Sequence, residues 1–286
     1  MAISKVGIYF HPRHAAARAL AEQIGRRLAQ DVEQVWMGSA WDDSITEEQI
    51  RGTDLLICVG GDGTVLRGAR SVVPHPVPIL GINMGKLGFL TELGPQEALN
   101  RLPDIVHRAG RVELRAMIQA EVVPPNGSTA APEGPYHALN DVVVSRAQVG
   151  RPVYVGVSID GTSLAVYRAD GVIVSTATGS TAYALSAGGP VLHPESRDMV
   201  LVPIAPHLSM SSPMVLPKDS VVELRVTTDH PTIISVDGQV NEPLEDGATV
   251  RIQASPHVAR FVKLHPADSF YATLAQRLDL MAKGTE

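Results

Sequence analysis

The stretch Gly60-Gly61-Asp62-Gly63-Thr64 carries the residue types best suited to chemistry in this 286-residue sequence. It follows an apolar run at 54–59 that predicts a buried parallel strand, and a helical pattern comes directly after it. Glycines let the backbone turn tightly and approach a phosphate, and the free N–H groups at the start of a helix favour anions. Because Asp62 repels phosphates, its predicted role is to take a proton from a hydroxyl group or to hold a metal. The alternative is a plain turn with an Asp cap.

A second glycine-rich stretch, NMGKLGFL at 83–90, follows another predicted strand at 77–82. Ligands of open α/β sheets bind beyond the carboxyl ends of the strands, so two parallel strands ending in such loops predict one shared crevice. The alternative is a loop that Phe89 anchors in the core. The candidate ligand-binding residues of this second loop are Asn83, Gly85, Gly88 and Phe89.

The third stretch is DGVIVSTATGSTAY at 170–183. An apolar strand leads through small hydroxyl-bearing residues into a short helix, which offers hydrogen-bond donors and leaves room for a base or a ribose. Tyr183 is suited to stacking or capping. Ser and Thr are also good N-caps, so composition leaves a structural role open.

Two familiar nucleotide-binding motifs are absent. The dinucleotide fingerprint G-x-G-x-x-G requires a third glycine where Leu66 stands. In GINMGKL at 81–87 the spacing is too short for a P-loop, and Leu87 replaces the hydroxyl residue that binds magnesium. The sequence therefore supports neither hydride transfer nor a P-loop NTPase. No His/Cys cluster has zinc spacing either, and no protein metal ligand is assigned.

The elements that must position these residues change in character along the chain. The first hundred residues alternate strands (5–10, 54–59, 77–82) with helical patterns, including 15–29 and 95–109, which predicts an open α/β sheet. From 111 to 264 short β-branched runs separated by turns predict an all-β domain. Asp160-Gly161 is a strong hairpin signal within it, and a second Asp-Gly pair lies at 237–238. We expect a flexible loop at 124–135, a helical interruption near 181–187 and a final helix at 269–283.

Taken together, the motifs resemble those of the NAD kinase family. In the family's order they are GGDGT at 60–64, NMGKLGFL at 83–90, Asn140-Asp141, the block at 170–183, SAGGP at 186–190 and SVDGQ at 235–239. GGDGT is shared with diacylglycerol and sphingosine kinases, and phosphofructokinases carry GGDG. The block at 170–183 is far more specific, and the motifs spread over most of the chain.

The resemblance implies transfer of a phosphoryl group from ATP or polyphosphate, with Mg²⁺ or another divalent cation, to the adenosine 2′-hydroxyl of NAD, giving NADP. It implies that Asp62 is the general base, with Gly63 beside it at the ligand and Gly60, Gly61 and Thr64 completing the phosphate loop. Arg151 and Arg168 stand at typically basic positions that suit a pyrophosphate. The other implied NAD-contacting residues are Asn140, Asp141, Asp170, Thr181, Ala182, Tyr183, Ala184, Leu185, Ser186 and Gln239.

The implied fold is an α/β N-terminal domain with a Rossmann-like open sheet plus an all-β sandwich, with NAD bound between them. We expect the α/β domain at residues 1–105, completed by about 266–286 with the C-terminal helix. The sandwich at 106–265 would bind NAD and mediate oligomerisation. The resemblance also implies a homodimer or homotetramer, the usual assemblies of the family, in which a neighbouring subunit helps to complete the site.

Composition agrees with a cytoplasmic enzyme. The net charge of −6 and the pI near 5.9 disfavour a nucleic-acid binder, and no run approaches membrane-spanning length. A single cysteine, Cys58, favours a reducing compartment, and the first residues lack the apolar stretch of a signal peptide.

Two departures and two rivals remain. Ala177 stands where the family usually has proline, and Met210-Ser211-Ser212-Pro213 lacks the usual arginine before the proline. One alternative is a lipid or sugar kinase that shares GGDGT. A lipid kinase should have an apolar or basic surface facing the membrane, and this acidic chain gives no sign of one. The other is a nucleotide-binding sensor without activity, which the intact Asp62, Asn140 and Asp170 disfavour.

Overall fold

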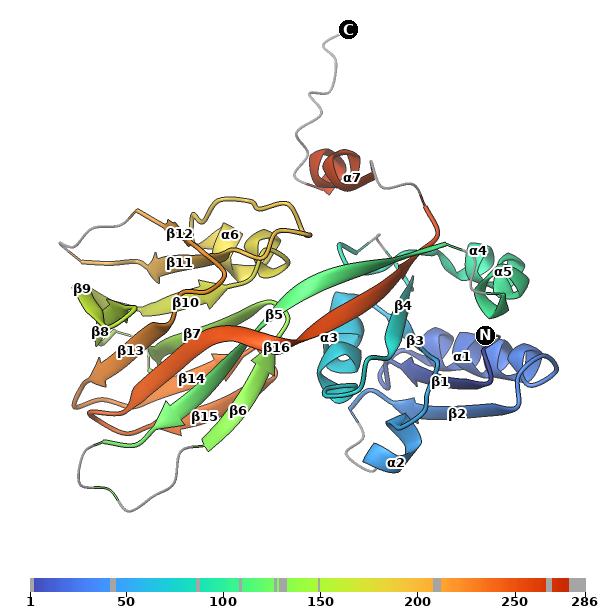
Figure 1. Cartoon of the computed structure of the whole chain (residues 1–286), viewed down its shortest axis with the longest axis horizontal. Coiled ribbons are helices and arrows are strands. Elements are labelled where there is room, and N and C mark those ends of the chain that lie inside the picture. The colour runs from blue at the N-terminus through green and yellow to red at the C-terminus, as the bar shows by residue number, and fades with distance from the viewer. Residues whose placement is uncertain are drawn as a thin grey trace, which may run out of the picture. The chain divides into compact units, whose positions relative to one another are not determined.

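The computed structural model describes residues 3–41, 45–85, 88–107, 110–125, 128, 133–148, 150–207, 212–265 and 269–277. The chain divides into two compact units (Figure 1). The N-terminal unit consists of Met1–Glu113 and Arg260–Glu286, and the C-terminal unit of Leu114–Ala259.

A parallel sheet forms the centre of the N-terminal unit. Its strands lie in the order β2 (Gln34–Ser39), β1 (Lys5–Phe10), β3 (Leu55–Gly60) and β4 (Pro78–Asn83). The end of β16 (Thr249–Lys263) joins as a fifth strand, because Arg260 and Phe261 pair in parallel with Pro78 and Ile79. Every residue of β3 is buried, as its apolar sequence predicts for a parallel strand covered on both faces.

Helices flank this sheet in the N-terminal unit (Figure 1). In α1 (Ala15–Leu28) the buried residues recur every three or four positions, so one face of the helix packs on the strands. The short α2 (Glu47–Ile50) begins with a capping box between Thr46 and Gln49. The helix α3 (Asp62–Ser71) starts immediately after β3, and α7 (Ser269–Arg277) is the last described helix.

The predicted helix at 95–109 is wrong as one continuous element. The structure has two short helices, α4 (Pro95–Asn100) and α5 (Leu102–Val106), and residues 108–109 lie outside the described ranges. Arg101 separates them with φ −100° and ψ 10°. Pro103 has no backbone N–H and is tolerated only in the first turn of a helix, so it starts α5 rather than continuing α4.

The C-terminal unit is a sandwich of two sheets. One has six antiparallel strands in the order β12 (Met214–Leu216), β11 (Met199–Ile204), β10 (Gly171–Ser175), β7 (Asp141–Arg146), β14 (Thr232–Val236) and β15 (Val240–Leu244). The other includes β16, β13 (Val222–Thr227), β8 (Val153–Ile159) and β9 (Thr162–Ala169), with β5 (Arg111–Val123) and β6 (Glu133–Ala138) paired beside them.

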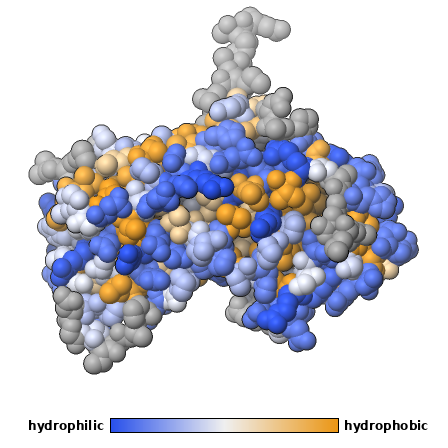
Figure 2. Space-filling view, viewed as in Figure 1, coloured by the Kyte–Doolittle hydropathy of each residue, from blue (hydrophilic) through white to orange (hydrophobic). Residues whose placement is uncertain are grey.

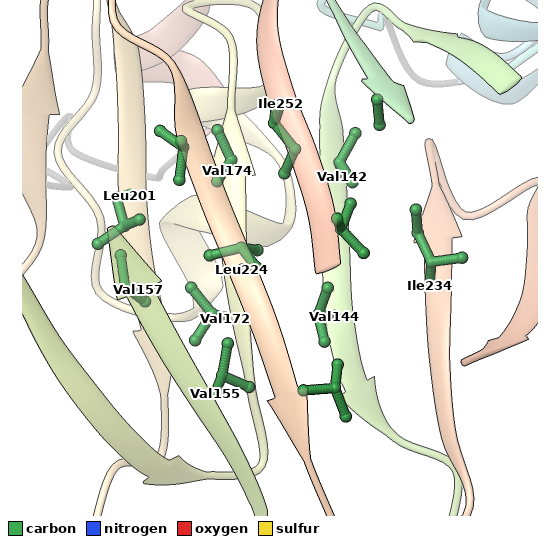
Figure 3. Packing of buried hydrophobic residues seen from close by; sticks show 14 of the residues in the cluster. Val142, Val144, Val155, Val157, Val172, Val174, Leu201, Leu224, Ile234 and Ile252 are labelled. Carbon is green, nitrogen blue, oxygen red and sulfur yellow. The ribbon is translucent and has the colours of Figure 1, made fainter. Parts of the chain in front are cut away.

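Apolar side chains from both sheets form the core of the C-terminal unit. Figure 3 shows Val142, Val144, Val172 and Val174 of one sheet among Val155, Val157, Leu224 and Ile252 of the other. Along each strand these residues alternate with positions that face away from the core, which is the period of two expected for a sandwich. The predicted sandwich is confirmed.

Both predicted Asp-Gly turns are confirmed. Asp160 and Gly161 connect β8 to β9 with φ values of 51° and 77°. In the β14–β15 connection, Asp237 and Gly238 are the central residues of a turn closed by the bond from the N–H of Gln239 to Val236, with φ values of 53° and 63°. Two consecutive positive φ angles are the requirement of a type I′ hairpin turn, which explains the preference for Asp-Gly.

Three other expected elements are found in part. The helical interruption is a 3₁₀ turn at Gly179–Thr181 followed by α6 (Tyr183–Ser186). Of the loop expected at 124–135, the last residues belong to β6, and most of the others lie outside the described ranges. Residues 278–283 of the expected final helix also lie outside the described ranges.

The surface in view is largely hydrophilic, with apolar residues in scattered groups (Figure 2). Among the described helices none combines the length and the apolar character that crossing a membrane requires.

Candidate functional site

The first glycine-rich loop connects β3 to α3. Gly60 ends the strand, Gly61 is the N-cap, and the helix begins at Asp62. A Cβ atom at Gly60 would overlap the side chain of Thr64, whereas a Cβ at Gly61 or Gly63 would meet nothing within 4 Å. Gly60 therefore serves packing, while Gly61 and Gly63 leave the backbone accessible to a ligand.

Asp62, in the first loop, forms hydrogen bonds with the backbone of the second loop. The backbone N–H of Phe89 donates to its Oδ2 at 2.8 Å, and that of Leu90 donates to its Oδ1 at 3.1 Å. A Cβ atom at Gly88 would overlap this carboxylate, so a glycine is required there. Each carboxylate oxygen has a further lone pair, so Asp62 can still accept a hydrogen bond from a hydroxyl group.

The second loop leaves β4 beside the first, as expected for strands that pair in parallel. Asn83 pairs with Gly60 in register, and its side chain closes the turn through two hydrogen bonds with the backbone of Gly85. Phe89 is only half-buried, and Leu90 is the buried anchor. Lys86 and Leu87 of this motif lie outside the described residues.

The Asn140-Asp141 pair lies at the start of β7 in the C-terminal unit. The carboxylate of Asp237 accepts hydrogen bonds from the N–H groups of Leu139 (2.9 Å), Asn140 (2.7 Å) and Asp141 (3.1 Å). On the carbonyl side, the N–H of Thr176 donates to Asn140 at 2.8 Å. Three motifs that are far apart in sequence thus meet at residues 139–141.

Asp141 is an unusual carboxyl group because it is only 5% exposed. Burial and, second to it, the negative charge of Asp237 raise the pKa of Asp141 to about 7. An acid with a pKa in this range changes its charge near neutral pH, a property that clusters at functional sites.

Asp170 precedes β10 and forms an ion pair with Arg146 at 2.8 Å. The two predicted basic residues behave differently. Arg151 and Arg168 are exposed, and neither guanidinium has an ion pair or hydrogen bond within the described ranges. They are therefore available to an anion.

The helical interruption combines exposed and buried positions. Tyr183 is 47% exposed, Ser186 is exposed, and Thr181, Ala182 and Leu185 are half-buried. The side chain of Ala184 instead packs in an apolar cluster with Val143, Ile173, Val200 and Val202. We conclude that Ala184 supports the helix from inside while its neighbours face outward.

Gln239 lies in the β14–β15 connection, and its Oε1 atom is buried without a hydrogen-bond donor among the described residues. Buried polar atoms are normally paired, so an unpaired one at a predicted ligand position requires an explanation. The described part of the chain holds no cluster of three or more His, Cys, Asp or Glu side chains able to bind a metal ion.

Comparison with models of protein families identifies the family to which the chain belongs. The ATP-NAD kinase N-terminal domain matches residues 3–110, and the ATP-NAD kinase C-terminal domain matches residues 139–264. The chain belongs to the NAD kinase family. An NAD kinase of Dehalococcoides mccartyi is 40% identical over 274 residues, which cover 96% of this chain and 95% of that protein. One of Chloroflexus aggregans is 39% identical over 276 residues, covering 96% and 99%.

Solved structures agree. A yeast NADH kinase complexed with NADH superposes with a TM-score of 0.85 at 22% identity, covering 100% of this chain and 90% of that one, and it supports the fold alone. An NAD kinase from Archaeoglobus fulgidus in complex with ATP has a TM-score of 0.74 at 26% identity, covering 97% and 100%. The predicted family, fold class and NAD kinase activity are confirmed, and a lipid or sugar kinase is excluded.

Several residues of the site have no individual signal in the sequence motifs. Asp237 belongs to a predicted turn and to the SVDGQ motif, but the motif gives it no role of its own, and the same holds for Arg146, Ser175 and Thr176. Their signal in the sequence was weak, because their partners are 24 to 98 positions away. Of the departures, Ala177 is buried, whereas Met210 and Ser211 lie outside the described residues.

Proposed function

We propose that this NAD kinase uses Asp62 as the base that takes the proton from the adenosine 2′-hydroxyl of NAD. The observation that carries the proposal is the placement of Asp62 at the carboxyl end of β3, between two glycines that leave open space beside the backbone. Its two hydrogen bonds from the second loop fix the carboxylate and leave one lone pair free on each oxygen.

The proposed reaction is a direct in-line transfer. The 2′-oxygen of NAD forms a bond to the γ-phosphorus of ATP while the bond from that phosphorus to the β,γ-bridging oxygen breaks. ADP leaves, and the hydroxyl proton passes to Asp62, so the products are NADP, ADP and one proton. Catalysis by positioning and by charge neutralisation is typical of phosphoryl transfer.

The N-terminal unit supplies groups for the phosphates in this proposal. The N-cap Gly61 has no side chain, so the first N–H groups of α3 have no capping side chain and favour an anion. The Oγ1 of Thr64 is buried without a partner among the described residues, which supports the presence of a ligand near this loop.

Mg²⁺ is part of the proposal as an ion that arrives with ATP. Protein sites for Mg²⁺ commonly combine one or two carboxylates with the phosphates of the substrate. Asp62 has the free lone pairs to serve as such a carboxylate, so the residues present fit the ion. When bound, Mg²⁺ would neutralise charge on the transferring phosphoryl group.

In the C-terminal unit, we assign NAD binding first to polar side chains that have no partner among the residues that the structure describes. These are the side chains of Asn140 and Asp141, the Oε1 of Gln239 and the exposed Arg151 and Arg168, which have no bond within the described ranges. Guanidinium groups match the pyrophosphate of NAD. The proposed set is completed by Asp170, which also pairs with Arg146, and by Thr181, Ala182, Tyr183, Leu185 and Ser186, with Ala184 in the core behind them.

ATP is the donor that we propose first. The Archaeoglobus fulgidus NAD kinase similar to this chain was solved in complex with ATP. Polyphosphate is the second donor to test, because the groups that we assign to the donor in the glycine-rich loops would contact its phosphates and not its base.

We further propose that the chain forms a homodimer or homotetramer through its C-terminal unit. The strand β9 ends its sheet and carries the exposed apolar residues Leu164 and Val166. An apolar edge strand invites pairing with another chain. Light scattering coupled to size-exclusion chromatography tests this, and a monomer at micromolar concentration would contradict it.

A cytoplasmic location completes the proposal. The one cysteine of the chain, Cys58, is free and buried, which suits a reducing compartment. Fractionation of cells that express the tagged chain tests the location.

The experiment for the proposed function incubates the purified chain with NAD and Mg-ATP. An NADP-specific dehydrogenase then measures product, and ³¹P NMR distinguishes a 2′- from a 3′-phosphate. We expect a 2′-phosphate and an equimolar amount of ADP. Parallel reactions with polyphosphate in place of ATP, and with EDTA, test the donor and the divalent cation. A chain that binds NAD without forming NADP under any of these conditions is a sensor rather than a kinase.

A further inference from the structure

The turn between β14 and β15 directs a carboxylate at the backbone of residues 139–141. The Oδ1 of Asp237 accepts from the N–H groups of Asn140 and Asp141, and its Oδ2 accepts from Leu139, at 2.7, 3.1 and 2.9 Å. Hydrogen bonds to an ionised acceptor are roughly twice as strong as neutral ones. Three of them on one carboxylate hold this short segment in one position.

The carbonyl groups of the same segment are bonded as well. The hydroxyl of Thr176 donates to Leu139, and the N–H of Thr176 and the hydroxyl of Ser175 donate to Asn140. The N–H of Asp237 donates to the carbonyl of Asp141 at 2.9 Å. Every backbone donor and acceptor of residues 139–141 is thus paired.

The side chains of Asn140 and Asp141 contrast with this backbone. Within the described ranges neither forms a hydrogen bond or an ion pair. The fold therefore fixes the main chain of these two residues and leaves their polar side chains to a ligand.

We propose that Asp237 is a positioning residue for NAD phosphorylation, holding Asn140 and Asp141 in place for NAD through three backbone hydrogen bonds. The inference rests on the proposed function, in which Asn140 and Asp141 contact NAD. Asp237 acts through residues 139–141 and does not need to touch NAD itself.

The conformation of the turn does not explain the choice of Asp at this position. Asp237 has a φ of 53°, which Asn adopts as readily as Asp. The three N–H groups donate to both carboxylate oxygens of Asp237, however, whereas the side chain of Asn has only one acceptor oxygen. The carboxylate is thus required by the bonds to residues 139–141 rather than by the turn.

Asp160 provides a matched comparison in the same unit. It occupies the equivalent place in the β8–β9 turn with a φ of 51°, and it accepts one hydrogen bond, from the N–H of Val221 at 2.8 Å. None of the residues that we assign to NAD or ATP lies in this turn. Asp160→Asn therefore controls for the effect of the same substitution on an Asp-Gly turn.

The test compares steady-state kinetics of the full chain, Asp237→Asn and Asp160→Asn, with NAD varied at saturating Mg-ATP. We expect kcat/KM for NAD to fall about 10- to 100-fold in Asp237→Asn, mostly through a higher KM, because misplaced binding groups cost rates of this order. Asp160→Asn should keep the wild-type KM. Circular dichroism confirms that both variants are folded.

A pH profile adds a readout that loss of stability alone does not move. Among the described residues, Asp237 is the one charged group that contributes to the raised pKa of Asp141. The residue of β10 that pairs with Asp141 is the neutral Ser175. Removing the charge of Asp237 should shift the pH dependence of NAD affinity to lower pH. Asp160→Asn should leave the midpoint in place.

Should Asp237→Asn fail to fold, Thr176→Val and Thr176→Ser test the same segment from its carbonyl side. The valine removes the hydroxyl that donates to Leu139 and accepts from the N–H of Gly179, and the serine keeps both bonds. We expect Thr176→Val to raise the KM for NAD and Thr176→Ser to restore it; a wild-type KM in Thr176→Val overturns the inference.

The outcomes separate the two proposals. If the wild type and Asp160→Asn form no NADP, the proposed function is wrong. If both are active and Asp237→Asn has the same KM and pH midpoint as Asp160→Asn, the positioning role is wrong while the proposed function stands.

Discussion

The Oδ2 of Asp62 lies 2.8 Å from the backbone nitrogen of Phe89, so the proposed base and the second glycine-rich loop are directly bonded. The adjacent N–H of Leu90 adds a second bond to the same carboxylate. Any change that moves residues 88–90 therefore also moves the group on which the proposed chemistry depends.

Gly88→Ala should reduce turnover without changing Asp62 itself. The new Cβ would overlap the carboxylate of Asp62 and the hydroxyl of Thr91, so one of them must move. We expect kcat to fall about 100-fold, the cost of a displacement of roughly 1 Å at a reacting group. Gly94→Ala is the control in the same region, because its Cβ would meet nothing within 4 Å and should leave kcat unchanged. Equal kcat values in the two variants would contradict this account of the loop.

Asp141→Asn should stabilise the protein at high pH. Burial and Asp237 raise the pKa of Asp141 from 3.8 to about 7, so folding favours its protonated form. The destabilisation is absent below the unfolded pKa, grows as pH rises between the two values, and is complete above the folded one. A shift of this size corresponds to about 4 kcal/mol as an order of magnitude.

Thermal unfolding of wild type and Asp141→Asn at pH values from 4 to 8 measures this difference. The variant should unfold at a higher temperature at pH 8, and the two proteins should converge toward pH 4. A constant difference across the range would show that Asp141 does not titrate as described.

Glu92 should stabilise the N-terminal unit above acidic pH. Burial would raise its pKa, but the ammonium of Lys263 and the N–H groups of His265 and Leu264 outweigh burial and lower the pKa of Glu92 below 4.5. A depressed pKa gives stability that is present above the unfolded value and lost as pH falls through the folded one. Lys263 lies 3.0 Å from Glu92, and both side chains are largely buried.

Glu92→Gln breaks this pair and leaves Lys263 without its charge partner, which should cost about 3 kcal/mol at pH 7. Glu97→Gln is the control, since its partners His265 and Arg101 are more exposed and such pairs contribute less than about 1 kcal/mol. Urea unfolding at pH 7 compares them. Similar losses in both variants would show that burial of the Glu92 pair is not what stabilises it.

Cys58 should not react with thiol reagents in the native protein. It is fully buried in β3, and burial raises its pKa far above the ordinary range, so almost no thiolate forms. Titration with Ellman's reagent should detect no thiol before denaturation and one afterwards. Rapid labelling of the folded protein would indicate that α3 and β3 separate readily.

Some elements of the fold can be predicted from the sequence and others cannot, for physical reasons. The apolar run of β3 and the Asp-Gly turns were predictable because burial and positive φ impose local requirements on residue type. The break at Arg101 was not, because helical spacing continued across it and only the position of Pro103 marked it. The strand at 34–39 lacks a continuous apolar run and was not identified.

The contacts of Asp237 at the site could not be predicted from the sequence either. Its three bonds join residues 96 to 98 positions apart, and they exist only because β14 pairs with β7 in one register. Sequence pattern identifies the turn and the motif, whereas the register that brings them together comes from tertiary packing.

Turnover of Asp62→Asn, with the dissociation constant for NAD measured alongside, tests the central claim most directly. The amide keeps one acceptor oxygen for the second loop but cannot take the proton from the 2′-hydroxyl. We predict that kcat falls by about 10²- to 10⁴-fold, the usual contribution of a placed base, while NAD binds within a few-fold of the wild-type affinity. Near-wild-type turnover in this variant would contradict the assignment of Asp62 as the base.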